Sequence, residues 1–250
     1  MKYDDVMKLA LERGFYFPSC EIYSDAQAGF WEYGPAGVSL KNKFLELWRR
    51  ELLRRDKMIE IDGSQIMSSS VFEASGHLTS FADPIVRCTN CKSTHRADRI
   101  IAELAKIEIP ESADLEEFDK VITEKNIKCP KCNSNFENTK KFNMMFQVGI
   151  GPEGEPAYLR PETCQSIFVD FPRLFKTMRG KLPLGIAQTG KSFRNEIAPR
   201  QSLLRLREFY QAEIEVFCNP AKLNDLDKFS EIQDTEIRIQ VNDEVKALTC

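Results

Sequence analysis

The side chains best suited to chemistry in this 250-residue chain lie within residues 190–217, which read GKSFRNEIAPRQSLLRLREFYQAEIEVF. Arg194 and Glu196 alternate along one predicted strand, and Phe209 and Glu213 alternate along the strand that returns after a polar loop. A guanidinium forms a planar, charged fork that matches phosphate or carboxylate groups, and an aromatic ring can stack on a base. The pattern predicts a hairpin with a nucleotide-binding face and an apolar reverse face. The alternative is a salt-bridged edge hairpin that binds no ligand.

The same hairpin resembles motif 2 of the class II aminoacyl-tRNA synthetases, in which F-R-N-E and a loop are followed by R-x-x-x-F-x-x-x-E. Further words in collinear order resemble the glycyl-tRNA synthetases of the archaeal and eukaryotic, dimeric type: GFYFPSCEIY, EYGPAG, SGHLTSFAD, RAD, FNMMF and YLRPET. The likeness extends from residue 6 to about residue 220. It implies an α+β fold, a class II synthetase core in which an antiparallel sheet is flanked by helices.

This resemblance also implies roles for individual residues. Arg194 would be the catalytic residue that bridges the glycine carboxylate and the α-phosphate of ATP. Glu162 and Glu213 would hold the glycine ammonium group, and Gln211 and Arg96 are further candidates for the glycine site. The expected ATP-binding residues are, besides Arg194, those of motif 2: Asn195, Glu196, Leu204, Arg205, Leu206, Arg207, Glu208 and Phe209.

The activity implied is that of a glycine-tRNA ligase, which activates glycine with ATP and transfers it to the acceptor end of tRNA(Gly). Glu196 would accept a hydrogen bond from the adenine amine, Arg205 would contact the outer phosphates, and Phe209 would stack under the base. Attack on the α-phosphate depends on positioning and charge stabilisation, and Mg²⁺ accompanies the phosphates. Two alternatives stay open: a class II synthetase for another small amino acid, and a non-catalytic module that binds nucleotide or tRNA.

Two Cys-x-x-Cys knuckles, Cys88–Cys91 and Cys129–Cys132, form a second chemical signal. Each knuckle presents two sulfurs from one tight turn, and two knuckles complete a tetrahedral Cys₄ shell for a structural zinc ion. The long segment between them carries two helical patterns, which predicts a zinc-binding insertion at residues 88–141. Four unligated thiols are the alternative, and His95 is a possible substitute ligand.

The elements that must position these residues divide the chain into four parts. Residues 1–87 form the first part of the core, with the motif 1 helix and strand, and residues 142–220 form the second part, which carries motif 2. The resemblance implies a homodimer through residues 38–67, whereas packing on its own domain is the alternative for this helix. We expect residues 221–250 to begin a further helical insertion. No Gly-x-Gly-x-x-Arg segment is found, so we expect motif 3 and the anticodon-binding domain to be absent, and this chain alone to be inactive or weakly active.

Composition excludes several other classes of protein. The net charge of −3 gives no global basic field, so a tRNA-binding surface must be local. No apolar run is long enough for a membrane span and the N-terminus lacks the pattern of a signal peptide, which predicts a cytoplasmic protein. The cysteines without ligand spacing are expected to be small apolar residues or surface thiols: Cys20, Cys164, Cys218 and Cys250.

Overall fold

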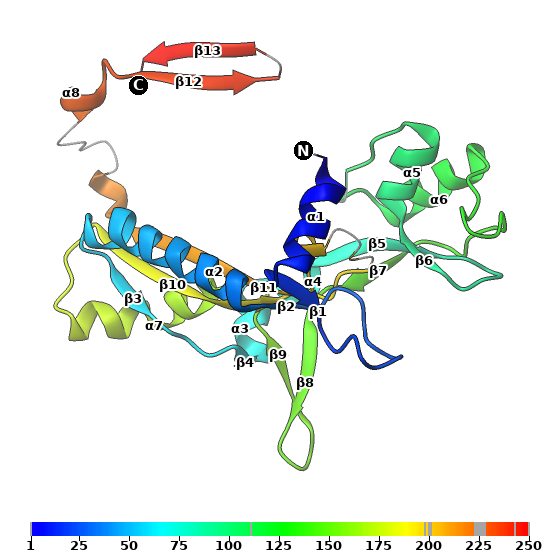
Figure 1. The fold of residues 1–250 in the computed structure, drawn as a ribbon, viewed down its shortest axis with the longest axis horizontal. Coiled ribbons are helices and arrows are strands. Elements are labelled where there is room, and N and C mark those ends of the chain that lie inside the picture. Colours follow the sequence, from blue (N-terminus) through cyan, green and yellow to red (C-terminus); the bar gives the residue numbers. More distant parts are fainter. Residues whose placement is uncertain are drawn as a thin grey trace.

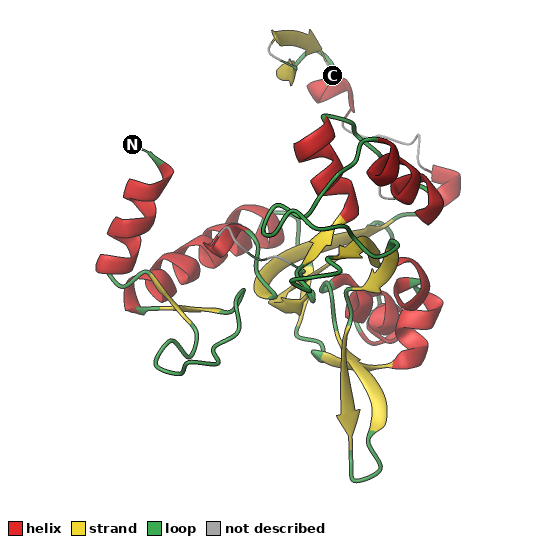
Figure 2. Cartoon of the chain, turned by 90° about the vertical axis from the view of Figure 1, so that its right-hand side faces the viewer, coloured by secondary structure: helices red, strands yellow, loops and turns green. Residues whose placement is uncertain are grey.

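The protein is seen in a computed structural model that describes residues 2–110, 112–197, 199, 202–222, 229–242 and 244–249. Figures 1 and 2 show helices arranged around several small sheets, with a long two-stranded ribbon running through the molecule. The described elements are, in chain order, α1 (Tyr3–Glu12), β1 (Tyr16–Pro18), β2 (Trp31–Tyr33), α2 (Pro35–Trp48), η1 (Arg49–Arg54), β3 (Ile59–Ile61), β4 (Ile66–Ser68), α3 (Ser69–Ala74), α4 (His77–Ser80), β5 (Ala82–Arg87), β6 (Thr94–Arg96), α5 (Ala97–Ala105), α6 (Leu115–Glu124), β7 (Lys140–Asn143), β8 (Phe146–Ile150), β9 (Glu155–Leu159), α7 (Cys164–Thr177), β10 (Leu184–Phe193), η2 (Ser202–Leu204), β11 (Glu208–Phe217), η3 (Pro220–Lys222), α8 (Phe229–Ile232), β12 (Glu236–Val241) and β13 (Glu244–Thr249).

The predicted hairpin is confirmed as β10 and β11, which pair antiparallel along their whole length, with β3 parallel to β10 on the other side. The alternation had predicted that Arg194 and Glu196 lie on the first strand. The strand β10 ends at Phe193, however, so both residues lie just beyond it. The reason is a tight turn, in which the Glu196 N–H donates to the Arg194 carbonyl at 2.7 Å. The Asn195 N–H donates to the carbonyl of Met144, which draws the chain away from β11.

The reverse face of the ribbon is apolar as predicted, but it is only partly covered. Tyr210 and Val216 are 39% and 52% exposed. The helix α2 lies across this face (Figure 1), where the Lys41 Nζ sits 3.9 Å from the centroid of the Tyr210 ring. The apolar stripe of α2 itself points outward, since Phe44 is 61% exposed. Among the residues that the structure describes, this apolar face of the expected motif 1 helix thus stays largely uncovered.

Arg160, directly after β9, is fully buried where three segments of the chain meet. Its backbone N–H donates to the Gln65 carbonyl at 2.8 Å, and its carbonyl accepts from the Phe193 N–H at 2.9 Å. Its guanidinium donates from Nε to the Lys191 carbonyl (2.9 Å) and from Nη1 to the Gly63 carbonyl (3.0 Å). Burial lowers the pKa of this guanidinium. The residue thus joins the loop after β3, the end of β9 and the end of β10.

Two small features make room for that side chain. A Cβ on Gly190 would lie 2.3 Å from the Arg160 Nη2, so only glycine fits at this point of β10. The Gln188 amide, oriented so that its hydrogen bonds are satisfied, accepts from the Arg160 Nη1 at 2.5 Å and donates to the Thr163 carbonyl at 3.1 Å. Gly190 thus leaves space for the buried guanidinium, and Gln188 binds it, between β10 and the loop that follows β9.

The predicted insertion carries an apolar cluster of its own. The helices α5 and α6 pack together over β5, and the members of the cluster are Val86, Ala97, Ile100, Ile101, Ile109, Phe118 and Ile127. The strands β5 and β7 pair antiparallel, with Ile85 opposite Lys140, so both ends of the segment leave the rest of the chain side by side. The boundaries at 88 and 141 stay predictions, and this pairing is what supports them.

The C-terminal part differs from the expected helical insertion at 221–250. Its described residues form one short helix, α8, and a hairpin of β12 and β13 in which every described position is exposed. The sequence Glu236–Val241 alternates β-branched and polar residues with a period of two, which favours a strand over a helix.

Cys250 and Arg200 lie outside the described residues. Among the residues described, no helix has the length and apolar character needed to cross a bilayer.

Replacing the buried arginine should destabilise the whole ribbon. In Arg160→Met the backbone carbonyls of Lys191 and Gly63 lose their donors while they stay buried, which costs about 1–3 kcal/mol for each unsatisfied group. We expect urea unfolding of the variant at a clearly lower midpoint. Arg99→Met is the matched control, because the Arg99 side chain is 65% exposed. Equal stability of the two variants would contradict the structural role of Arg160.

Candidate nucleotide and amino-acid site

The guanidinium of Arg194 lies between two aromatic rings. Its central carbon is 5.4 Å from the centroid of Phe209 on β11 and 5.5 Å from that of Phe81. Such contacts are attractive because the ring faces carry negative charge. The Arg194 Nε donates to the Pro161 carbonyl at 3.0 Å, which orients the group toward the segment after β9. The structure thus brings Arg194 and Phe209 together, and adds Phe81, which the sequence indicated only as part of the SGHLTSFAD word.

Glu213 is held by the residue that precedes α7. The Thr163 N–H donates to the Glu213 Oε2 at 2.8 Å, and the Thr163 hydroxyl donates to the same oxygen. Carboxylate oxygens of Glu162 and Glu213 and the thiol of Cys164 all lie within 4.8 Å of one another. Two acids so close together form a site that suits a positively charged group such as an ammonium.

The same acids affect their neighbours. Burial raises the pKa of Glu215, and the charges of Glu213 and Glu162 raise it further. Burial also raises the pKa of the Cys164 thiol, with an added contribution from its hydrogen bond to Glu162 (Sγ to Oε1, 3.2 Å). The thiol is therefore protonated at neutral pH and acts as a donor, not as a nucleophile.

The polar residues of motif 2 are engaged with one another. Arg205 forms an ion pair with Glu196, in which both Nε and Nη2 lie 2.7 Å from Oε2. Arg207 donates from Nε to the Glu196 carbonyl (3.0 Å) and from Nη1 to the Ala28 carbonyl (2.8 Å), and burial lowers its pKa. Arg207 therefore braces the loop against the N-terminal region. The sequence had suggested it as an ATP-binding residue, whereas here its Nε and Nη1 bind backbone carbonyls.

The other predicted residues vary in exposure. Leu206 is buried at 8% exposure, whereas Leu204 is 74% exposed. Glu208 forms an ion pair with Lys191, and the pKa of that lysine is raised by the hydrogen bond. The Gln211 Oε1 is buried, and no partner for it is found among the described residues.

Arg96 lies at the end of β6 with its charge already balanced. Its Nη1 lies 2.9 Å from Asp83 Oδ2, and its Nη2 lies 2.9 Å from Asp98 Oδ2. The side chain is 9% exposed. This geometry favours a structural role for Arg96 over direct binding of a free carboxylate.

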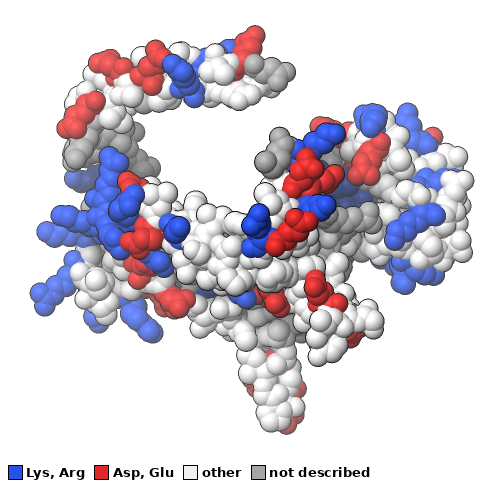
Figure 3. All heavy atoms as spheres, in the orientation of Figure 1, with Lys and Arg blue, Asp and Glu red and all other residues white. Residues whose placement is uncertain are grey.

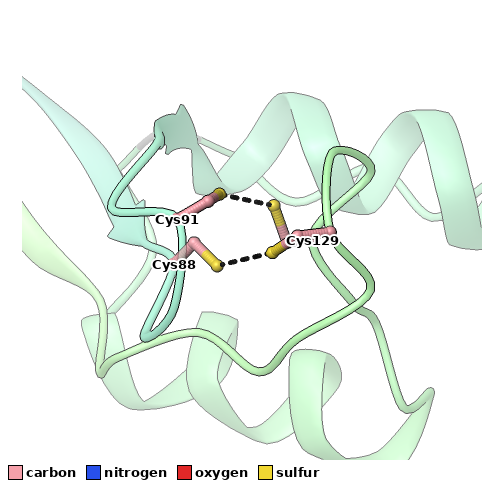
Figure 4. A group of neighbouring side chains, drawn as sticks. Cys88, Cys91 and Cys129 are labelled. Carbon is pink, nitrogen blue, oxygen red and sulfur yellow. Dashed lines mark hydrogen bonds between the residues drawn. The ribbon is translucent and has the colours of Figure 1, made fainter.

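The four cysteines of the two knuckles converge in space (Figure 4). The Sγ atoms of Cys88 and Cys132 are 3.4 Å apart and those of Cys91 and Cys129 are 3.6 Å apart. A tetrahedral zinc ion with Zn–S bonds of about 2.3 Å needs sulfurs roughly 3.8 Å apart, so the arrangement fits a metal of this kind. The predicted alternative ligand His95 lies outside the four sulfurs, 4.0 Å from the Cys129 Sγ.

The environment shifts the thiols of the cluster in both directions, since burial raises the pKa of Cys88 to about 11. Hydrogen bonds from the Ser134 side chain and backbone lower the pKa of Cys132 to about 6. The Ser93 hydroxyl lies 3.1 Å from the Cys91 Sγ and 2.9 Å from the His95 Nε2. Groups that hydrogen-bond to metal ligands in this way hold them in a fixed orientation.

Lysine and arginine side chains gather at one end of the molecule (Figure 3), where α2 ends and where the loop between α7 and β10 lies. The exposed basic residues of these segments are Arg50, Arg54, Arg55, Lys57, Arg173, Lys176, Arg179 and Lys181. The net charge led us to expect that any tRNA-binding surface would be local, and this group is a local basic surface of that kind.

Comparison with known proteins supports the same family. The family model described as tRNA synthetase class II core domain (G, H, P, S and T) matches residues 136–236. The chain is 44% identical over 239 residues to the glycine–tRNA ligase of Methanothrix thermoacetophila, covering 95% of this chain and 41% of that protein. It is 45% identical over 233 residues to the enzyme of Methanocaldococcus jannaschii, covering 93% of this chain and 40% of that protein. The chain thus spans about two fifths of the length of these relatives.

Solved structures show the fold. A structure titled as the RNA binding domain of threonyl-tRNA synthetase from Cryptosporidium parvum Iowa II has a TM-score of 0.50 and 20% identity, and the match covers 92% of this chain and 43% of that one. A prolyl-tRNA synthetase from Cryptosporidium parvum, complexed with halofuginone and AMPPNP, has a TM-score of 0.51 and 12% identity over 94% of this chain and 36% of that one. Together these findings confirm the resemblance stated from the sequence: the chain has a class II tRNA synthetase fold and is related to the archaeal glycine–tRNA ligases over the part of their length that it spans.

Proposed function

We propose that this chain carries the glycine- and ATP-binding part of a glycine–tRNA ligase. The observation that carries the proposal is the convergence of Arg194, Phe209 and the pair Glu162 and Glu213 around one loop, residues 160–163. The Arg194 guanidinium matches the glycine carboxylate and the α-phosphate of ATP, and the Phe209 ring matches the adenine base. The two carboxylates match the glycine ammonium group. The identity to curated glycine–tRNA ligases supports glycine as the amino acid.

Arg194 is prepared for two ligand contacts. Its Nε is occupied by the Pro161 carbonyl, and neither Nη atom has a hydrogen-bond partner among the described residues. Both can therefore donate to the glycine carboxylate and to the α-phosphate. The reaction joins these two groups, so a cation between them lowers their repulsion and stabilises charge that develops in the transition state. Phe209 would carry the base, and Glu162 and Glu213 would hold the ammonium group.

The remaining assignments follow the geometry of motif 2. Glu196 and Arg205 form an ion pair in the free chain. We propose that they contact different parts of bound ATP: Glu196 accepts from the adenine amine, and Arg205 contacts the outer phosphates. We assign Mg²⁺ to the phosphates of ATP. The acidic cluster found among the described residues includes the Cys164 thiol, a poor ligand for so hard a cation. Because the reaction supplies translation, we place the protein in the cytoplasm with tRNA(Gly) as its macromolecular substrate.

Removing the guanidinium should weaken binding of the reaction intermediate. We expect Arg194→Ala to bind a non-hydrolysable glycyl-adenylate analogue about ten- to a hundredfold more weakly, since a hydrogen bond to a charged group contributes about 1.5–3 kcal/mol. Titration calorimetry with the 250-residue chain measures this directly. Arg173→Ala is the control, because that exposed arginine lies on α7.

Other outcomes of the same titration separate the alternatives. Equal affinity for the alanyl analogue would favour a synthetase for another small amino acid. A chain that binds tRNA but neither ATP nor the analogue would be a non-catalytic binding module, and the proposed function would be wrong.

We also propose that Cys88, Cys91, Cys129 and Cys132 hold a structural zinc ion. Four sulfurs leave no open position on a tetrahedral ion, so this metal would stabilise the insertion and would not take part in the reaction. The close spacing of the sulfurs and the low pKa of Cys132 support the proposal.

Loss of one ligand should release the metal. The purified chain is expected to contain about one zinc ion, and Cys132→Ser to contain much less and to unfold at a lower temperature. Elemental analysis and thermal unfolding measure the two effects. Cys20→Ser is the control, since Cys20 is exposed and belongs to no ligand pair. Unchanged zinc content in Cys132→Ser would rule out the site.

The exposed stripe of α2 supports a homodimer through residues 38–67. Leu40, Phe44 and Leu47 are 58%, 61% and 47% exposed on one helix, which is a large apolar surface to leave in water. We propose that a second copy of the chain covers it.

A charge placed in this stripe should separate the subunits. Phe44→Glu is expected to sediment as a monomer at concentrations where the unmodified chain is a dimer, because burial of an unpaired carboxylate is costly. Asn42→Glu adds the same charge at an exposed position next to the stripe and should leave the dimer intact. A monomeric unmodified chain would contradict the proposed dimer.

A further inference from the structure

We propose that His77 is a positioning residue that fixes the carboxylate of Glu162 for the amino-acid substrate. The inference rests on the proposed function, in which Glu162 binds the ammonium group. One carboxylate oxygen of Glu162, Oε1, has several close polar contacts. Glu162 Oε1 lies 2.6 Å from the Gln165 Nε2, 3.2 Å from the Cys164 Sγ and 3.3 Å from the His77 Nε2. Gln165 and Cys164 thus donate hydrogen bonds to Oε1 and the His77 nitrogen lies at ion-pair distance from it, whereas Oε2 has no hydrogen-bond partner among the described residues.

Two of these donors are local, but His77 comes from a distant segment. Gln165 and Cys164 follow Glu162 in the first turn of α7, so they move with it. His77 begins α4, which the Asn143 Nδ2 braces by donating to the carbonyls of His77 (3.1 Å) and Leu78 (2.9 Å). The contact from His77 to Glu162 therefore ties the carboxylate to a separate part of the core.

The imidazole itself is held on both its edge and its faces. Its ring centroid lies 6.1 Å from that of Phe72 and 5.3 Å from that of Phe81, and its side chain is 15% exposed. The Ser75 hydroxyl lies 2.8 Å from the Nδ1. Packing fixes the plane of the ring, and Ser75 fixes which nitrogen faces which partner.

The partners determine where the ring carries its hydrogen. A carboxylate oxygen only accepts hydrogen bonds, so the nitrogen that faces Glu162 must be Nε2–H. In the neutral ring the Ser75 hydroxyl then donates to Nδ1. The inferred chain therefore runs from Ser75 through His77 to Oε1 of Glu162, with the 3.3 Å contact as its last link.

The consequence for the substrate is geometric. With Oε1 held by two hydrogen bonds and by the contact from His77, the carboxylate cannot rotate freely, and Oε2 is the oxygen left for an ammonium group beside Glu213. A fixed acceptor costs less entropy on binding than a mobile one. His77 therefore contributes to amino-acid binding without touching the substrate or ATP.

Two substitutions separate the hydrogen bond from the packing. His77→Phe keeps an aromatic ring between Phe72 and Phe81 and removes the N–H, whereas His77→Gln keeps a donor. We expect His77→Phe to bind the glycyl-adenylate analogue about tenfold more weakly in calorimetry, with ATP affinity unchanged, and His77→Gln to recover most of the loss. Cys20→Ser, at an exposed position that contacts neither His77 nor Glu162, is the control.

A second measurement needs no ligand. The chain has two histidines, so a long-range proton–nitrogen NMR spectrum contains two rings, and His95→Gln assigns them. We expect His77 in the Nε2–H form and a shift of its Nε2 signal in Glu162→Gln. An Nδ1–H ring, full analogue affinity in His77→Phe, or an equal loss of ATP affinity would each overturn the positioning role. If the unmodified chain binds no analogue, the proposed function fails instead, and the NMR result alone decides whether this hydrogen-bond chain exists.

Discussion

The buried guanidinium of Arg160 is the constraint on which the rest of this structure depends. A charged group without water around it is stable only where hydrogen bonds replace the lost hydration. Here backbone carbonyls accept from two of its nitrogens, Lys191 on β10 from Nε and Gly63 in the loop after β3 from Nη1, whereas Nη2 has no hydrogen-bond partner among the described residues. Because the carbonyls belong to different segments, the arginine holds β10, the loop and the end of β9 in one fixed arrangement.

That arrangement determines the position of the site. Two of the three residues after Arg160 contact motif 2: Pro161 accepts from Arg194, and Thr163 donates to Glu213. The loop thus connects the cation and the acid of the candidate site through its own backbone. A small displacement of this loop would separate the groups that the proposed reaction needs together.

The candidate site also shows how a free chain keeps its charges balanced. Arg205 pairs with Glu196, and Lys191 pairs with Glu208, whereas Arg194 is stabilised by two aromatic rings and one carbonyl. Aromatic contacts stabilise a guanidinium without occupying its Nη atoms. The residue proposed to bind both reacting groups is therefore held in place while its donors stay available.

The sequence by itself determined the local features of this protein. The period-two pattern within residues 190–217 predicted the hairpin, the two Cys-x-x-Cys knuckles predicted a cluster of sulfurs, and collinear words indicated a resemblance to the synthetase family. These features are readable because each depends on residues close together in the chain. The helical expectation for 221–250 was wrong where β12 and β13 form, because Glu236–Val241 alternates apolar and polar residues with a period of two, which favours a strand.

Only the tertiary structure decided how distant residues combine. In the sequence Arg160 is one residue of the YLRPET motif and shows no sign of its contacts. In the structure its N–H groups donate to carbonyls about a hundred residues earlier and about thirty residues later in the chain. The packing of Phe81 on Arg194, the contact of His77 with Glu162, and the use of Arg207 as a brace likewise have no signature in spacing. Hydrogen bonds and ring contacts between remote segments depend on where the backbone folds back. A linear pattern can therefore name the residues of a site, but it cannot say which of them hold the others in place.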